Sequence, residues 1–265
     1  MDILKRNIAP ISQKAWDEID ARAKDVLTTT LSARKVLNVN GPYGWNYLAV
    51  PEGRLEIFET EKEDTVKSGV YQLKNLIEAR RTFVLKKWEL DNIERGAKDI
   101  DLSALEEAAE DIALFEENAI YNGNANANIT GLAEAAQHTL SFGENGNTIL
   151  TAIGKAKVHL LSAYAKGPYD LIVSPKAYEQ INQLYQGGAL HRQIQNLIGG
   201  EVVLSKVVDG ALLIPSRHED LEFTVGHDFS IGYESNDTES IKLFISESFT
   251  LRILDDQIIV KFNVQ

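Results

Sequence analysis

The chain has no cysteine among its 265 residues, which excludes disulfides and thiolate metal sites. It also has no apolar run that approaches the length of a membrane-spanning helix. Residues 1–6 are charged, and the apolar segment of a secretory signal does not follow them. These absences predict a soluble protein that stays in the cytoplasm and has no membrane partner.

Basic residues are scarce as well, since 27 Lys and Arg face 39 Asp and Glu and leave a net charge of -12. Binding of nucleic acid needs a basic face that displaces counterions from phosphates, so the composition argues against a nucleic-acid partner. Residues 99–154 contain ten carboxylates and no Lys or Arg. This segment is either an acidic solvated face or a surface complementary to another copy of the chain.

Sequence motifs of common enzyme chemistry are missing too. There is no phosphate loop, no Gly-x-Gly-x-x-Gly, no His-Glu-x-x-His and no Gly-x-Ser-x-Gly. The five histidines are scattered, and the Glu-x-x-His pairs of a di-iron bundle are absent. We therefore expect no catalytic residue, no metal ligand and no enzyme activity. The carboxylates of an acidic helix are expected on its outer, exposed face: Glu106, Glu110, Glu116 and Glu117.

The patterns that are present predict an α+β protein. Residues 11–35 have the spacing of an amphipathic helix with Ser12 as its N-cap. Residues 51–73 predict a long hairpin with an acidic tip at 59–64, and 79–85 a strand. A second helix is predicted over 103–121, beginning with a capping box of Ser103 and Glu106.

The middle of the chain, residues 131–222, reads as an inserted module. Helical patterns near 149–165 and 175–185 flank a buried strand at 171–173. The remainder is rich in strands, including 241–245 and 249–254 as separate ones. Strands come early, then helices, then strands again, which favours segregated elements over a doubly wound sheet.

Two segments carry the most functional information. Residues 88–96 combine one large aromatic, two spaced apolar residues and five polar ones before a glycine, which favours contact with other protein. Trp88 is expected to pack in a core or an interface rather than to stack on a planar ligand. Residues 229–233 alternate like a half-buried strand, which packs in the core or forms one wall of an apolar groove. Leu27 and Leu31 would then supply the other wall, with Arg34 as a charged rim.

Segments along the whole chain resemble the family 1 encapsulins, bacterial shell proteins with the fold of tailed-phage major capsid proteins. They are residues 4–6 with Ala9, Pro10 and Trp16, then 41–45, 88–96, 101–107, 167–169, 230–234 and 243–250. The resemblance implies a peripheral domain, an extended loop at 50–73 and an axial domain at 131–222. The peripheral domain comprises 1–40, 74–130 and 223–265.

The resemblance also implies a function. Encapsulins assemble into a closed icosahedral homo-oligomer, for which the smallest shell of about 60 subunits is the default. They enclose a cargo enzyme, here a peroxidase or a ferritin-like protein, through its C-terminal targeting peptide. The implied peptide groove is formed by Leu27, Leu31, Arg34, Asn38, Phe229, Ile231 and Tyr233. Asn38 lacks the negative charge that an aspartate would bring to a basic peptide end.

Further implications concern an opening and a cofactor. The family lines its five-fold opening with a loop that corresponds to Gln186, Gly187, Gly188, Ala189, Leu190 and His191. No cofactor is required, although some members bind flavin against a tryptophan at the position of Trp88. Two alternatives stay open: a prophage major capsid protein that packages DNA, and an enzyme such as a protease or bacteriocin. The acidic composition and the first helix count against the former, and the missing motifs count against the latter.

Overall fold

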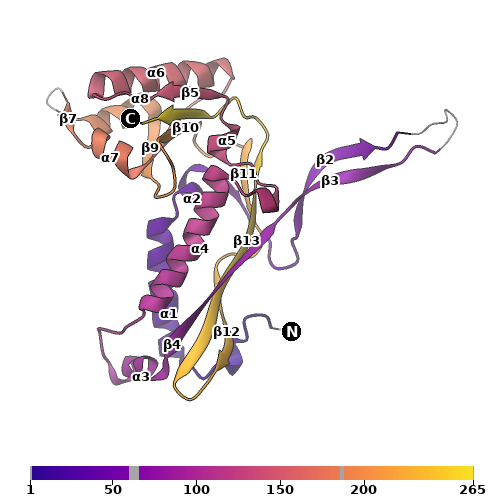
Figure 1. The fold of residues 1–265 in the computed structure, drawn as a ribbon, viewed down its shortest axis with the longest axis vertical. Helices are drawn as coiled ribbons and strands as arrows, with labels where there is room; N and C mark the ends of the chain where they lie inside the picture. Colours follow the sequence, from indigo (N-terminus) through magenta and orange to yellow (C-terminus); the bar gives the residue numbers. More distant parts are fainter. Residues whose placement is uncertain (1, 60–65, 186–187, 265) are drawn as a thin grey trace.

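The computed structural model describes residues 2–59, 66–185 and 188–264. The molecule has three parts (Figure 1): a long lower part, an upper part of packed helices and strands, and a hairpin that projects sideways. Two five-stranded sheets and the helices against them confirm the predicted α+β class. Within the described ranges, no helix is long and apolar enough to cross a membrane.

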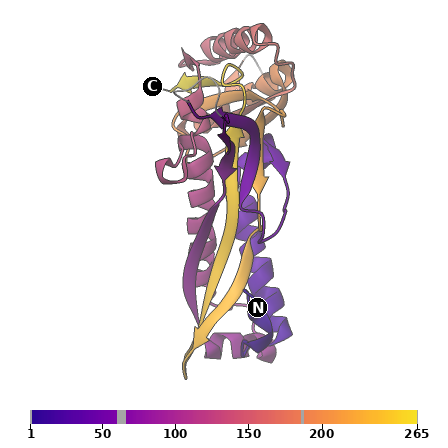
Figure 2. The same cartoon turned by 90° about the vertical axis from the view of Figure 1, so that its right-hand side faces the viewer.

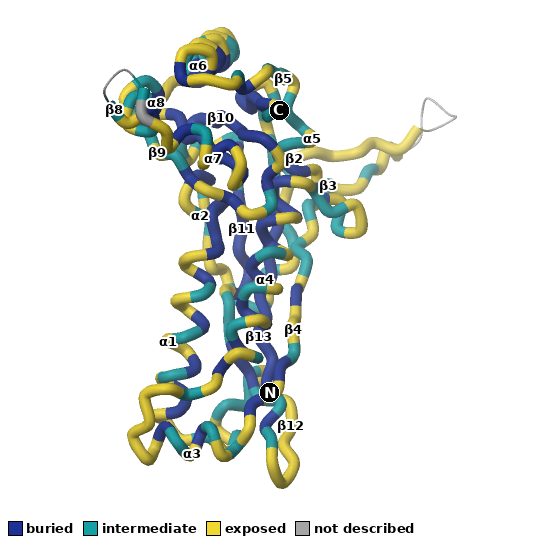
Figure 3. Tube along the Cα trace, turned by 60° about the vertical axis from the view of Figure 1, so that its left-hand side comes forward, coloured by how far each residue is buried: buried dark blue, intermediate teal, exposed yellow. Residues whose placement is uncertain are grey.

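The lower part is a sheet whose long strands run along the molecular axis (Figure 2). Its central strand β13 pairs with β4 on one edge and with β12 and then β11 on the other, while β1 pairs in parallel with β11. The strands are β1 (Asn38–Asn40), β4 (Ile77–Lys86), β11 (Leu221–Val225), β12 (Ser230–Asn236) and β13 (Ser240–Ile253). The helices α1 (Gln13–Thr30) and α4 (Ser103–Asn122) pack on this sheet beside each other (Figure 3).

The first helix begins as predicted and ends earlier. The Oγ atom of Ser12 accepts a hydrogen bond from the backbone N–H of Ala15 at 3.2 Å, which confirms the N-cap. The predicted helix over 11–35 is wrong at its end, because α1 stops at Thr30 and a separate turn, α2 (Ala33–Val36), follows. The cause is a carboxylate of α4, Glu117, which accepts the N–H groups of the intervening turn.

The predicted capping box of α4 is also wrong. Ser103 is already inside the helix, and its N–H and hydroxyl both donate to Oδ1 of Asp101, at 3.2 and 2.7 Å. Glu106 forms an ion pair with Arg22 of α1 at 2.5 Å instead. The carboxylate of Asp101 therefore accepts the N–H group at the start of α4, and Glu106 links α4 to α1 instead of capping α4.

The two strands predicted at 241–245 and 249–254 form one strand, β13. The polar residues between them, Ser246, Glu247 and Ser248, continue the ladder with β4 and are buried. A buried carboxyl group can continue a strand where another group binds it, and Arg34 binds that of Glu247 at 3.0 Å.

The upper part contains the second sheet, in the order β5-β14-β10-β6-β9. Its strands are β5 (His138–Ser141), β6 (Tyr169–Val173), β9 (Gly199–Leu204), β10 (Ala211–Pro215) and β14 (Val260–Asn263). The surrounding elements are α6 (Gly146–Ser162), α7 (Pro175–Ile181), α8 (Leu190–Ile198), β7 (Leu184–Tyr185) and β8 (Gly188–Ala189). β14 comes from the segment assigned to the peripheral domain but lies in this sheet.

The projecting hairpin consists of β2 (Ala49–Ile57) and β3 (Gly69–Asn75), as predicted. Most of its predicted acidic tip, residues 60–65, lies outside the described residues. Its arms expose large apolar side chains, among them Ile57 (64% exposed) and Tyr71 (76% exposed). Such a surface is typical of contact with another protein chain. The remaining short elements are η1 (Arg6–Ile8), α3 (Lys87–Arg95), η2 (Ala125–Ala127) and α5 (Leu132–Ala135).

Candidate functional site

A groove of about 500 Å³ lies between α1 and the start of β12. We call it the α1–β12 groove. Its apolar surface is formed by Leu4, Ala23, Leu27, Leu31, Phe229, Ile231 and Ile245. Its polar lining consists of Arg6, Asp20, Lys24, Thr28, Arg34, Asp228 and Ser230. An apolar surface with polar groups along it is what an extended peptide segment needs.

Helix periodicity explains the α1 wall. Positions 20, 23, 24, 27, 28 and 31 are three or four residues apart, so they share one face of the helix. The opposite wall begins with the loop that precedes β12 and includes Ile231 on that strand. The N-terminal segment closes the lower end, because the N–H of Tyr233 donates to the carbonyl of Leu4 at 2.8 Å. Arg6 then binds Asp20 of α1 through two hydrogen bonds, at 2.7 and 3.1 Å.

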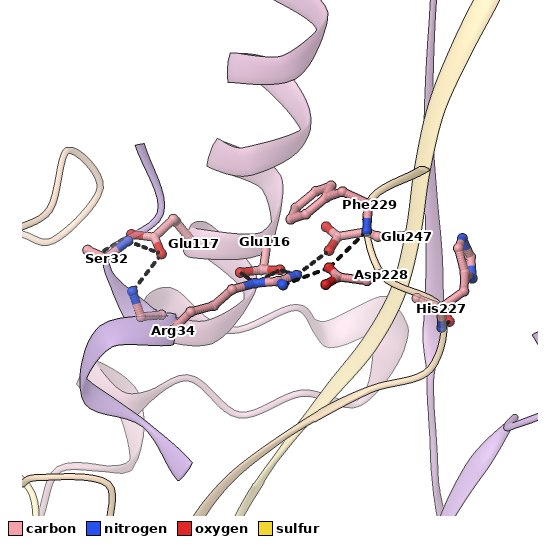
Figure 4. Close-up of polar contacts among 10 residues, drawn as sticks. Ser32, Arg34, Glu116, Glu117, His227, Asp228, Phe229 and Glu247 are labelled. Carbon is pink, nitrogen blue, oxygen red and sulfur yellow. Dashed lines mark hydrogen bonds and ion pairs between the residues drawn. The ribbon is translucent and has the colours of Figure 1, made fainter. Parts of the chain in front are cut away.

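The upper end of the groove is built around Arg34, which was predicted as a charged rim (Figure 4). Its guanidinium forms ion pairs with Glu116 at 2.5 Å, Asp228 at 2.7 Å and Glu247 at 3.0 Å. We call these four residues the Arg34 cluster. The side chain is only 18% exposed and also lies over the ring of Phe229. Arg34 is therefore mostly buried, and it links α2 to α4 and β13 as well as bordering the groove.

Burial sets Glu247 apart from an ordinary glutamate within the Arg34 cluster. Burial and the neighbouring Glu116 raise the pKa of Glu247 well above that of an ordinary glutamate. The Oε1 atom of Glu247 is buried and has no hydrogen-bond partner among the described residues, which disfavours its charged form. Burial opposes the charge of Arg34, but the surrounding carboxylates raise the pKa of this guanidinium overall.

The next residue of α4, Glu117, fixes the turn that carries Arg34. Its Oε1 accepts the N–H groups of Ser32 at 2.9 Å and Ala33 at 2.8 Å, and the Ser32 hydroxyl donates to Oε2. Burial raises the pKa of Glu117. The prediction that Glu116 and Glu117 lie on the outer face of α4 is wrong, since they are 0% and 1% exposed. Sequence periodicity offered a signal, because both follow Ile112 and Ala113 at helical spacing.

The structure brings together five of the seven residues predicted for the peptide groove: Leu27, Leu31, Arg34, Phe229 and Ile231. Asn38 and Tyr233 do not line it. Asn38 opens β1 and pairs with Glu222 of β11, while the hydroxyl of Tyr233 donates to Asn236. The sequence reasoning missed Lys24 and Thr28, although their spacing from Leu27 and Leu31 on the helix could have identified them.

Trp88 stands apart from this groove, at the start of α3. Its side chain is 69% exposed, and the guanidinium of Arg95 lies 5.3 Å from the ring centroid. The apolar residues of α3 that face the core are instead Leu90 and Ile93. The prediction that Trp88 packs in the core of this chain is therefore wrong. Its exposed ring can still contact a neighbouring subunit or a ligand.

Of the residues predicted to line the five-fold opening, Gln186 and Gly187 lie outside the described residues. Gly188 and Ala189 form β8, which pairs with β7. Leu190 is 1% exposed and begins α8, and the ring of His191 lies edge-on to Tyr178. Among residues 2–59, 66–185 and 188–264, no group of three or more His, Asp or Glu is arranged to hold a metal ion.

Comparison with solved structures defines the class of protein. A virus-like particle protein from Pyrococcus furiosus superposes with a TM-score of 0.68 at 17% identity, over 94% of this chain and 99% of that one. The capsid protein of Myoviridae phage XM1 superposes with a TM-score of 0.57 at 12% identity, over 86% and 89%. At these identities the likeness shows the fold alone. The chain has the tailed-phage major capsid fold, as predicted.

Sequence comparison gives the family. Residues 1–250 match the family described as "Encapsulating protein for peroxidase". The type 1 encapsulin shell protein of Rhodospirillum rubrum is 38% identical over 262 residues, which cover 96% of this chain and 94% of that protein. That of Brevibacterium linens is 30% identical over 261 residues, 97% of either chain. The chain belongs to the encapsulin shell proteins, a family of structural proteins and not of enzymes. This confirms the predicted nanocompartment shell over the prophage capsid.

Proposed function

We propose that this protein forms the smallest icosahedral shell, of about 60 subunits, in the cytoplasm. We propose further that the α1–β12 groove holds the C-terminal peptide of an enclosed peroxidase or ferritin-like enzyme. Membership of the shell family supports assembly with copies of itself. The apolar side chains exposed on β2 and β3 support it as well, because a neighbouring copy would bury them.

The observation that carries the peptide proposal is the shape and lining of the groove. From Asp20 to Leu31, the eleven residue steps along α1 to its C-cap span about 16 Å at helical rise. An extended peptide covers that length with about five residues and turns every second side chain toward the apolar lining. Five residues suffice for a short tail and are too few for a folded domain. The groove therefore fits a linear segment.

Cargo loading tests this proposal. The shell would be co-expressed with a fluorescent protein that carries the C-terminal residues of the peroxidase or ferritin-like enzyme encoded beside the shell gene. Ile231→Arg places a charge in the apolar lining, but Ile231 is 5% exposed, so loading is read only from shells that assemble at normal size, and these should carry little fluorescence. Thr28→Trp, at an exposed position on the α1 wall, blocks the groove without a buried charge and should have the same effect. Leu254→Arg is the matched control, because Leu254 is 57% exposed and lies outside the groove. Normal loading of the Ile231→Arg shell would contradict the proposal.

Electron microscopy of the same preparations tests the assembly. Uniform hollow icosahedral particles of a single small diameter, with no nucleic-acid absorbance, are expected. A discrete small oligomer, a larger shell or packaged DNA would overturn the proposed assembly. Because imaging does not depend on the tail, failure of assembly and failure of peptide binding are read separately.

A flavin is the one cofactor for which a site can be proposed. The exposed indole of Trp88, with Arg95 beside it, offers an apolar face and a cation to a planar anionic ligand. Purified wild-type shells should then be yellow, and Trp88→Ala shells should be colourless with unchanged particles. Colourless wild-type shells after expression with added riboflavin would leave Trp88 as a contact residue.

A further inference from the structure

The two ends of the α1–β12 groove carry opposite charge, and this bears on which peptide it accepts. At the lower end, Arg6 and Asp20 neutralise each other through their paired hydrogen bonds. Lys24 lies one turn further along α1 and is exposed. In the described parts of the chain, no side chain pairs with its ammonium group. The lower end therefore has one positive charge without a partner.

At the upper end the balance is reversed. One guanidinium, that of Arg34, meets three carboxylates in Glu116, Asp228 and Glu247. If Glu247 holds a proton, as its burial favours, two negative charges still face one positive charge. Asp228 is the exposed member, with 49% of its side chain accessible. Its Oδ1 binds Arg34 and the N–H of Phe229, whereas Oδ2 has no hydrogen-bond partner in the described parts. This oxygen is available to a cation.

The spacing of these charges fits a short extended segment. From Lys24 to Leu31, the C-cap of α1, seven positions correspond to about 10 Å at helical rise, and Asp228 lies beyond this end, bound to Arg34. An extended peptide covers this distance in about three residues and reaches the Arg34 cluster with one or two more. The surface between the two ends is apolar, with Leu27, Leu31 and Ile231 along it. A matching segment has one charge at each end and apolar side chains at alternate positions between them.

On the basis of the proposed peptide site, we propose that the groove selects a dipolar segment in one orientation. An acidic side chain lies at Lys24, and a basic side chain lies at Asp228 four or five residues away. Reversal of the two charges sets like against like at both ends, while the apolar contacts stay the same. Each half-exposed ion pair changes affinity by a factor of about 1.5 to 5. Both ends together give a preference of at least about twofold.

Two designed tails on a fluorescent protein test this proposal. Both contain one Asp and one Lys separated by alternating leucine and glycine, and they differ only in which charge comes first. Wild-type shells should load one order at least about twofold more than the other. A shell with Lys24→Glu and Asp228→Lys, whose net charge is unchanged, should prefer the opposite order. Shells with Lys24→Gln and Asp228→Asn should load both tails alike, and they control for changes to the surface that do not depend on charge.

The outcomes separate this inference from the proposed function. Equal loading of both tails by wild-type shells would overturn the dipolar selection and leave the peptide groove intact. An unchanged preference in the charge-inverted shell would do the same. If shells load the native tail but neither designed tail, charge and apolar spacing are insufficient, and the inference is also overturned. If loading of the native tail is not reduced by substitution of Ile231, the proposed peptide groove itself is wrong.

Discussion

Removal of Arg34 should destabilise the subunit far more than removal of an exposed arginine. Arg34 is the cation that faces the buried carboxylates Glu116 and Glu247, both with fully buried side chains. Arg34→Met keeps most of the side-chain volume and leaves these carboxylates without a counter-charge. Loss of one partner from a buried ion pair costs about 3–5 kcal/mol of folding free energy.

The lower part of that range applies here, because the raised pKa of Glu247 lets it keep its proton when the guanidinium is removed. A loss of about 3 kcal/mol lowers the melting temperature of a protein of this size by roughly 6–12 °C. The matched control is Arg81→Met. Arg81 pairs with Asp111 at 2.9 Å, but both side chains are more than half exposed. An exposed pair of this kind contributes at most about 1 kcal/mol.

Thermal melts of the variants would be compared at equal protein concentration and in the same assembled state, since association shifts the melting temperature. Arg34→Met combined with Glu116→Gln should recover most of the loss, because Glu247 can hold its proton and the remaining carboxylate, that of Asp228, is half exposed to water. If Arg34→Met melts no lower than Arg81→Met, the buried charges are not what Arg34 compensates. Lack of rescue by Glu116→Gln would refute the reasoning as well.

Two further outcomes can be measured on the same preparations. Because the pKa of Glu247 is raised, the folded state binds this proton more tightly than the unfolded chain does. The stability that the proton contributes is therefore complete below about pH 4.5, and it is lost as the pH rises toward the raised pKa. Glu247→Gln cannot lose a proton, so its melting temperature should fall less than that of wild type over this range, and parallel curves would contradict the assignment. Ser12→Ala removes the N-cap of α1 and should cost about 1 kcal/mol, whereas Ser162→Ala, an exposed hydroxyl at the end of α6, should cost much less. Equal melting temperatures of these two serine variants would show that the cap contributes nothing.

The elements that the sequence predicted well depend on local patterns. The apolar periodicity of α1 and the alternation at 229–233 each mark one wall of the groove, because a repeat of about four or two residues sets which face is buried. Periodicity left Leu27, Leu31 and Ile231 as residues of either the core or a groove, and the resemblance to the encapsulins selected the groove. The hairpin of β2 and β3 was predicted from its flanking apolar segments and polar tip.

The parts that the sequence did not predict depend on residues far apart in the chain. The end of α1 at Thr30 is set by Glu117, whose carboxylate reaches the turn from 85 positions away. The burial of Glu247 within β13 depends on Arg34, 213 positions away. A local pattern shows a carboxylate only as a polar residue, so it reads as exposed. Only the folded structure of the subunit shows that a cation lies beside such a carboxylate.

The position of β14 in the upper sheet constrains when that sheet can form during synthesis of the chain. Val260–Asn263 lie between β5 and β10, and β5 has no other strand partner in the described sheet. A nascent chain that has not reached residue 260 therefore has β5 unpaired and one edge of β10 open to other strands. Completion of the upper sheet comes late in synthesis, so a subunit presents its finished upper surface to neighbours only after almost all of the described chain has left the ribosome.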